Sequence, residues 1–174
     1  MLAKGTFYFD HSAGADVSAE YEVRTVDGAG NVSAKVAAQG PSGTRAHIYD
    51  DSDGKRGFTY TGEWERQRRL QPAYEGTISR SRENGAIAEI SFTGREVLLF
   101  AKMGPECGKA SVSVDGEAEE IVDTYSADDI WGVCVYRKAL PSGVEHTLRV
   151  TVLGEKGLHA QDAYVCIDGA RVHP

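Results

Sequence analysis

The middle of the chain, residues 92–125, shows two hydrophobic patterns in succession. Residues 97–101 are apolar without a break, which is typical of a strand covered on both faces. After a turn rich in Gly and Pro, apolar and polar residues alternate over 110–115, the period of a strand with one dry face. Asp115-Gly116 then supplies the positive φ angles of a two-residue hairpin turn. We predict two strands entering a hairpin, and we expect the later strands to pack onto this unit.

The same patterns predict strands along most of the remaining chain. In the clearest of them, Leu148, Val150 and Val152 are expected to face inward. Turn dipeptides separate the strands, with Asp-Gly at positions 53, 115 and 168 and Asn-Gly at 84. Residues 63–70 are long enough for two helical turns but have no apolar stripe. Other strands are expected at 47–50, 57–60, 88–92, 133–136 and 165–167. We therefore predict an all-β protein built as an antiparallel sandwich.

The first 38 residues form a separate unit in this interpretation. Tyr21, Val23 and Thr25 alternate with polar residues, a turn follows at 27–31, and a second short strand is expected at 32–37. A cluster of chain-breaking residues at 39–43 marks the boundary. We predict a domain fragment at 1–38, a linker at 39–43 and a second module at 44–174. We expect residues 5–38 to pack against that module, because a free half-domain would expose strand edges.

Composition narrows the function classes. With 174 residues and a 41% apolar fraction, the chain suits one soluble domain plus a fragment. A net charge of −7 argues against a general nucleic-acid binder, which needs a basic face. No apolar run is long enough for a membrane helix, so no membrane insertion is expected. No signal peptide opens the chain, and Met1 is followed by what resembles the middle of a domain, so we expect an export signal to lie in preceding sequence.

Local charge and the three cysteines leave alternatives open. Five arginines cluster between positions 66 and 82 and could meet an acidic sugar, or they form a solvated rim balanced by nearby glutamates. Cys107, Cys134 and Cys166 include no CxxC pair and have no His partner at metal spacing. A Cys134–Cys166 bridge requires that their strands be neighbours, which spacing does not decide.

Two stretches resemble known families. The run Y-x-V-x-T-x-D-x-x-G-N-x-S from Tyr21 to Ser33 resembles the last hairpin of bacterial fibronectin type III domains. The second module carries Y-x-G-x-W at 60–64, G-K-A-x-V-x-V-D-G at 108–116, H-T-L-R-V at 146–150 and Y-V-x-I-D at 164–168. This set resembles the galactose-binding-domain-like, jelly-roll modules appended to bacterial glycoside hydrolases.

The second resemblance implies sugar binding without catalysis, through loops at one end of the sandwich or through a sheet face. Sugar sites combine aromatic faces with fixed polar groups. Trp131 is our first stacking candidate because it lies in a loop-like segment, whereas the alternative is a rim residue covering the core. Trp64 belongs to the family scaffold pattern. For each further candidate the alternative is an ordinary exposed loop residue: Tyr74, Arg82, His159, Gln161 and Asp162.

The resemblance also implies a metal. Related modules often hold a structural Ca²⁺ near the first and last strands, and the matching carboxylates here are Asp51, Asp53 and Asp168. Asp51-Ser52-Asp53-Gly54 is similar to the start of a calcium loop but lacks the later ligands. The alternative is that Asp53-Gly54 and Asp168-Gly169 are ordinary turns.

No motif for hydrolase, nucleotide or zinc-peptidase chemistry is present, so we predict no enzyme activity. The resemblance implies an extracellular or cell-surface module that targets a catalytic domain of the same full-length chain to a glycan. A structural spacer with no ligand is the alternative, and a small hydrolase is a weaker third hypothesis.

Overall fold

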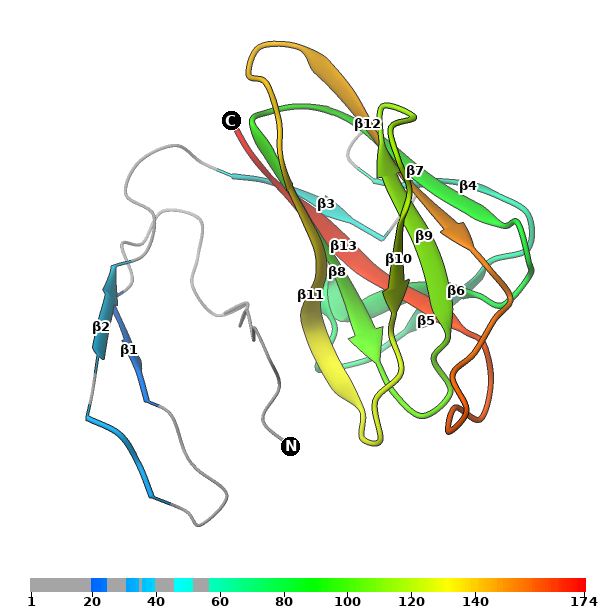
Figure 1. The fold of residues 1–174 in the computed structure, drawn as a ribbon, viewed down its shortest axis with the longest axis horizontal. Coiled ribbons are helices and arrows are strands. Elements are labelled where there is room, and N and C mark those ends of the chain that lie inside the picture. The colour runs from blue at the N-terminus through cyan, green and yellow to red at the C-terminus, as the bar shows by residue number, and fades with distance from the viewer. Residues whose placement is uncertain (1–19, 25–30, 35, 40–45, 52–56) are drawn as a thin grey trace.

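A computed structural model describes residues 20–24, 31–34, 36–39, 46–51 and 57–174 (Figure 1). Near the start, strands β1 (Glu20–Val23) and β2 (Val36–Gln39) pair antiparallel in a sheet of their own. The predicted fibronectin type III identity of this hairpin and the boundary at 39–43 stay predictions, since residues 40–45 lie outside the described part. The expected packing of residues 5–38 also falls largely outside it.

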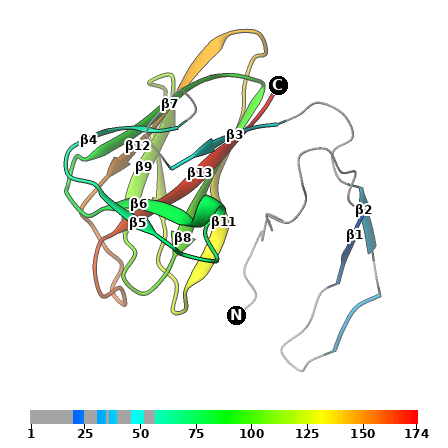
Figure 2. The ribbon, with the colours of Figure 1, turned by 180° about the vertical axis from the view of Figure 1, so that it is seen from behind.

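The other strands form two antiparallel sheets that face each other (Figures 1 and 2). The five-stranded sheet has the order β10 (Glu120–Asp123), β9 (Lys109–Val114), β12 (Glu145–Val152), β7 (Ile87–Thr93) and β4 (Thr59–Thr61). The six-stranded sheet has the order β11 (Ile130–Ala139), β8 (Glu96–Met103), β13 (Val165–His173), β6 (Thr77–Ser81) and β5 (Glu65–Arg68), and β3 (His47–Asp50) also pairs with β13. The predicted antiparallel β-sandwich is confirmed.

The hydrophobic core fills the space between the two sheets. Leu148 and Val150 from β12 and Leu99 and Ile167 from the opposite sheet are at most 2% exposed. The inward-facing half of β12 was predicted from its alternation, and Arg149 between those residues is exposed. Each such side chain contributes about 1.5–3 kcal/mol by leaving water. The core therefore holds the sheets together without a disulfide.

The central unit differs from the prediction in one respect. Asp115 (φ 58°) and Gly116 (φ 70°) form the predicted tight turn, closed by a hydrogen bond from the Glu117 N–H to the Val114 carbonyl at 3.1 Å, although the pairing of β9 with β10 begins only at Val112 and Glu120. However, β8 and β9 lie in different sheets, so the segment before this turn crosses the sandwich. Strand β8 pairs with β11 at one edge and with β13 at the other. Successive residues along it are buried, so both its faces are covered and its apolar run is unbroken.

Three further expectations change. Residues 65–68 form strand β5, consistent with the missing apolar stripe, and the described residues contain only a short 3-10 turn (Tyr74–Gly76) as helical structure. Trp131 lies in β11 rather than in a loop. Strand β13 runs through Asp168-Gly169, where its register against β8 shifts, so this dipeptide is a bulge and not a turn. Among the described residues, no helix has the length and hydropathy to span a bilayer.

Candidate functional site

A groove of about 820 Å³ lies beside the β5–β6 hairpin. Strands β5 and β6 pair with Glu65 opposite Arg80, and the next pair along the sheet sets Cys166 of β13 opposite Arg80. The sheet order thus brings the start of β13 next to a hairpin that is distant in sequence. The residues lining the groove are Gly62, Glu63, Trp64, Glu65, Arg80, Ser81, Arg82, Glu83 and Tyr164.

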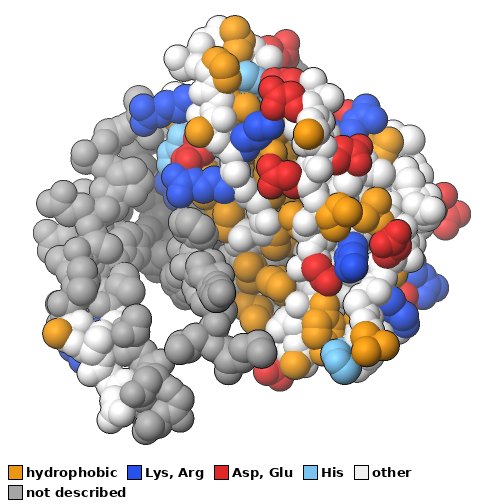
Figure 3. Space-filling model, in the orientation of Figure 1, with side chains coloured by type: hydrophobic (Ala, Val, Ile, Leu, Met, Phe, Trp, Pro, Cys, Tyr) orange, Lys and Arg blue, Asp and Glu red, His pale blue; other side chains and the backbone are white. Residues whose placement is uncertain are grey.

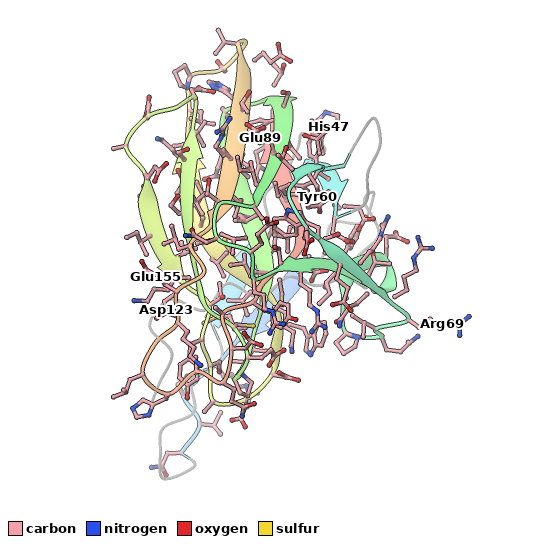
Figure 4. All side chains as sticks on the ribbon, turned by 90° about the vertical axis from the view of Figure 1, so that its right-hand side faces the viewer. His47, Tyr60, Arg69, Glu89, Asp123 and Glu155 are labelled. Carbon is pink, nitrogen blue, oxygen red and sulfur yellow. The ribbon has the colours of Figure 1, made fainter. Side chains whose placement is uncertain are left out.

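Trp64 is held in a fixed orientation at one side of this groove. Its ring packs against Tyr60 with 4.9 Å between centroids, and its indole Nε1–H donates to the Thr61 carbonyl at 3.2 Å. Figure 4 shows Tyr60 on the inner side of this region and Arg69 at the outer tip of the β5–β6 hairpin. Trp64 remains half-exposed, so part of its ring faces the groove.

Tyr164 and two arginines form the opposite side. The guanidinium carbons of Arg80 and Arg82 lie 4.3 and 5.2 Å from the centre of the Tyr164 ring. Arg80 donates to Glu65 through Nη2 at 2.8 Å and Nε at 3.0 Å, and Arg82 Nη1 donates to Asp162 at 2.8 Å. Each guanidinium has five N–H donors, more than these carboxylates accept. The arrangement is a pair of oriented, charge-balanced donor groups beside aromatic rings.

The same contacts keep the carboxylates of the groove ionised. Hydrogen bonds from Arg80 lower the pKa of Glu65. The backbone N–H of Ala163, followed by Arg82, lowers the pKa of Asp162. Glu83 accepts the backbone N–H of Glu63 at 2.5 Å. The groove therefore presents fixed acceptors as well as donors, which suits a ligand rich in hydroxyl groups.

The predicted site residues fall into separate places. Trp64 and Arg82 line the groove, and Asp162 reaches it through its ion pair. His159 is exposed on the loop before β13 and lies outside the groove. Gln161 is on the same loop, where its backbone N–H donates to the Pro105 carbonyl and its own carbonyl accepts from Lys156. Tyr164 was treated only as scaffold, although an aromatic residue opening a strand is a signal for such a role.

Trp131 belongs to a different cluster. It is half-buried and packs, with Leu70 and Tyr164, against a small apolar group made of Ala73, Ile78, Cys107 and Cys166. The ammonium of Lys102 lies 5.2 Å from its ring centre and pairs with Glu106 and, at 2.9 Å, with Asp129. Its ring therefore packs between apolar side chains and a cation, and it does not line the groove.

Tyr74 lies near a group of three carboxylates, which we call the acidic junction: the buried Asp51 and Asp168 and the partly buried Asp50. Strand β13 pairs with β6 before Asp168 and with β3 after it, so the bulge faces the end of β3. Asp168 Oδ1 accepts the Tyr74 backbone N–H at 2.8 Å, while Asp168 Oδ2 and Asp50 Oδ1 are buried and have no hydrogen-bond partner among the described residues. Burial, followed by repulsion from Asp51 and Asp50, raises the pKa of Asp168 to about 7.

The acidic junction fits a hard cation in part. Two buried carboxylate oxygens without partners are the donors that Ca²⁺ prefers. Against this, Asp51 already accepts hydrogen bonds from Thr77 and, at 2.7 Å, from Ser79, and the Arg66 guanidinium lies 3.7 Å from it. In the described part of the chain, no set of three His, Cys, Asp or Glu side chains has metal-binding geometry. Asp53 lies outside the described residues.

Comparisons with known proteins add a partial relative. No protein-family profile matches this sequence. A stretch of 93 residues, 53% of the chain, is 37% identical to a Flavonifractor plautii enzyme named A type blood alpha-D-galactosamine galactosaminidase. The chain spans only 8% of that enzyme's length. The similarity is thus to a small part of a much longer glycosidase.

Solved structures share the fold. One is the exo-β-1,3-galactanase of Phanerochaete chrysosporium, 15% identical over 79% of this chain and 30% of that chain, with a TM-score of 0.54. Another is a family 35 carbohydrate-binding module from Clostridium thermocellum, 18% identical over 72% of this chain and 97% of that one, with a TM-score of 0.48. The first match bears on the fold alone, and the second is too weak to bear on fold or function.

Proposed function

We propose that this chain is a non-catalytic carbohydrate-binding module of a larger carbohydrate-active enzyme. The observation that carries the proposal is the groove, in which Trp64 and Tyr164 stand beside two oriented guanidinium groups. The partial similarity to a glycosidase, over 8% of its length, supports an accessory part of such an enzyme. The module acts outside the cell or at its surface, where it holds a catalytic domain of the same full-length chain near its glycan.

The groove would bind a sugar through two kinds of contact. The exposed part of the Trp64 ring covers the apolar C–H face of a pyranose, which an aromatic ring does better than an aliphatic side chain. Arg82 and Glu83 donate to and accept from hydroxyl groups at its edge, and these hydrogen bonds set the orientation. Because Arg80 and Arg82 are already held against Tyr164, little side-chain entropy is lost on binding.

The residues that line the groove and the enzyme that is partly similar to this chain both bear on the ligand class. Glu63, Glu65 and Glu83 outnumber the two arginines among the lining residues, which favours a neutral or amine-bearing sugar over a polyanion. The Flavonifractor plautii relative is named for galactosamine. We therefore expect a glycan with a terminal galactose-type sugar, and galactosamine is the first one to test.

Calcium is a second, structural part of the proposal. Asp51 and Asp168, with Asp53 from outside the described residues as a third ligand, would hold one Ca²⁺ at the acidic junction. The unpartnered oxygen of Asp168 supports this, because a divalent cation would satisfy it and would neutralise the repulsion among the carboxylates. The ion would tie β3 to β13 and take no part in sugar binding.

A glycan array with the fluorescently labelled full chain tests the function. We expect selective binding of a small set of glycans, weakened by free galactose-type sugars. If no glycan is bound even at millimolar protein in affinity electrophoresis, the spacer alternative replaces the binding proposal. Turnover of aryl-glycoside or ester substrates by the purified chain would contradict its non-catalytic assignment.

A further inference from the structure

Two of the three cysteines meet inside the apolar cluster beside Trp131. Cys107 and Cys166 are 0% and 1% exposed, and their Sγ atoms are 3.9 Å apart although the residues are separated by 59 positions. A disulfide requires about 2.05 Å between sulfurs and Cα atoms no more than about 7 Å apart. The two sulfur atoms would therefore have to move about 1.85 Å closer to form the bond.

The backbone on both sides of Cys107 is already fixed next to β13. The Gly108 N–H donates to the Tyr164 carbonyl at 2.8 Å, and the Tyr164 N–H donates to the Glu106 carbonyl at 3.0 Å. Cys107 lies between these two bonds, and Cys166 lies two residues after Tyr164 and therefore on the same face of the strand. Cys107 pairs with Tyr164 in a parallel bridge, so main-chain pairing holds Cys107 beside the start of β13, where its sulfur contacts that of Cys166.

From this geometry we propose that Cys107 and Cys166 are a disulfide-forming pair, oxidised by a small-molecule disulfide such as oxidised glutathione. The Cys107 thiolate attacks the glutathione disulfide and releases one glutathione as the thiol. The sulfur of Cys166, after losing its proton, then attacks the Cys107 sulfur of the mixed disulfide and releases the second glutathione. The two cysteines lose two hydrogens and two electrons, and one glutathione disulfide becomes two thiols.

The two sulfurs are suited to different steps. The contact with Cys166 lowers the pKa of the Cys107 thiol, and the contact with Cys107, followed by burial, raises the pKa of Cys166. Once the folding chain brings the two sulfurs together, Cys107 is therefore the more nucleophilic of the two. Because both residues are buried, oxidation takes place as the chain folds, and the finished disulfide is shielded from reductants.

Cys134 is excluded as a partner and serves as an internal control. It lies on β11, and β8 separates β11 from β13 in the sheet. Two strand spacings of about 4.8 Å exceed the Cα separation that a disulfide spans. The bridge between Cys134 and Cys166 that the sequence left open is therefore not compatible with the strand order.

The crosslink would stabilise the candidate groove as well as the turn that contains Cys107. It would join the turn at 104–108 to the start of β13, where Tyr164 supports Arg80 and Arg82. The crosslink does not depend on sugar binding, because it requires only that the two thiols lie close together.

Refolding the full chain in a glutathione redox buffer tests the proposal. After acid quenching and alkylation under denaturing conditions, we expect one modified cysteine, Cys134, and a peptide pair joined through Cys107 and Cys166. The oxidised protein should melt on the order of 5–10 °C higher than the reduced protein. Cys134→Ser should still form the crosslink, and Cys107→Ser or Cys166→Ser should abolish it.

Three alkylated cysteines after refolding in excess oxidised glutathione would overturn the proposal, as would a crosslink that includes Cys134. If a Cys107 or Cys166 variant does not fold, peptide mapping of the wild type and of Cys134→Ser decides the question. A chain that binds no glycan but forms this crosslink would reject the proposed function and leave this inference in place.

Discussion

Tyr164 supports both guanidinium groups of the candidate groove, so its ring tests whether they are held in place for binding. Tyr164→Ala removes two cation–π contacts and should weaken glycan binding by about 1–2 kcal/mol, or roughly tenfold. Tyr164→Phe keeps the ring face and should bind like the wild type. Isothermal titration of the bound glycan measures both. Equal losses in the two variants would show that the hydroxyl matters and the ring does not.

Asp168 gives a prediction on pH and metal. Its pKa is about 7 in the folded protein because of burial and its acidic neighbours, against about 3.9 in the unfolded chain. The folded state therefore binds more protons between these values, so stability of the metal-free protein falls as pH rises from about 4 to 7 and then levels off. Thermal melts in the presence of a chelator should show this fall.

Asp168→Asn is the matched variant, since it keeps an oxygen to accept the Tyr74 N–H. In chelator it should remove the part of the fall that Asp168 contributes, so the variant should gain stability relative to the wild type as pH rises from about 4 to 7. At pH 8, calcium should raise the melting temperature of the wild type and leave the Asn variant nearly unchanged. A wild type that is indifferent to calcium at pH 8 would reject the proposed metal site.

Individual residues show where sequence reasoning reached the site and where it stopped. Arg82 was named as a polar candidate and Trp64 was interpreted chiefly as scaffold, and both line the groove. Tyr164 was missed because its role depends on β13 lying next to β6, a pairing between distant segments. Trp131 was expected in a loop because glycine and aspartates surround it, but it lies within β11, at an irregularity where the register against β8 shifts between Ile130 and Val133. The partners of Cys107 likewise depend on sheet order.

At the scale of elements, the β9–β10 hairpin is braced by one buried histidine. His146 Nδ1 is 2.7 Å from Asp115 Oδ2, and its Nε2 is 2.9 Å from the Pro141 carbonyl oxygen. Both ring nitrogens face acceptors, so the doubly protonated ring satisfies the site. The hydrogen bond to Asp115, followed by that to Pro141, raises the pKa of His146, and His146 in turn lowers the pKa of Asp115.

The sign of the resulting pH dependence follows from these directions. The contribution of His146 is fully present below its unfolded pKa of about 6.5 and is lost as pH rises through its raised folded pKa. We expect His146→Gln to destabilise the protein by about 1–3 kcal/mol at pH 6 and by less at pH 9. Urea unfolding at the two pH values measures this. A cost that grows toward pH 9 would contradict a charged ring.

The turn at 104–108 requires close backbone packing at Gly108. A Cβ on Gly108 would lie 2.5 Å from the Glu155 carbonyl oxygen and 2.7 Å from the Ala163 Cα, and backbone atoms do not move aside easily. Gly108→Ala should cost about 2–3 kcal/mol by overpacking. Gly157→Ala is the control, because its Cβ would meet only Asp123 Oδ2 at 3.6 Å. Chemical denaturation compares the two, and similar stabilities would refute the packing argument.

Elements of the fold differ in how far local sequence determines them. The Asp115-Gly116 turn and the alternation in β12 are local signals, and both were predicted correctly. The assignment of β8 and β9 to opposite sheets was not predicted. A connection of a few residues can form either a hairpin within one sheet or a crossover between two sheets. The Asp168-Gly169 bulge was taken for a possible turn because its conformation is set by the change of partner from β6 to β3.

On the scale of the whole molecule, the sequence carries a modest negative charge of −7. The face in Figure 3 carries acidic, basic and hydrophobic side chains close together. The net charge of −7 and the balanced ion pairs of the groove favour a neutral or amine-bearing ligand over a polyanion. Binding should therefore change little between low and moderate salt.

The central claim is that the groove at Trp64 binds the glycan, and a pair of tryptophan variants tests it most directly. Trp64→Ala and Trp131→Ala are titrated calorimetrically with the best glycan from the array, after circular dichroism has confirmed that both are folded. We predict a loss of at least about tenfold in affinity for Trp64→Ala, from one stacking contact, and near wild-type affinity for Trp131→Ala. Binding that survives Trp64→Ala and is lost in Trp131→Ala would contradict this account.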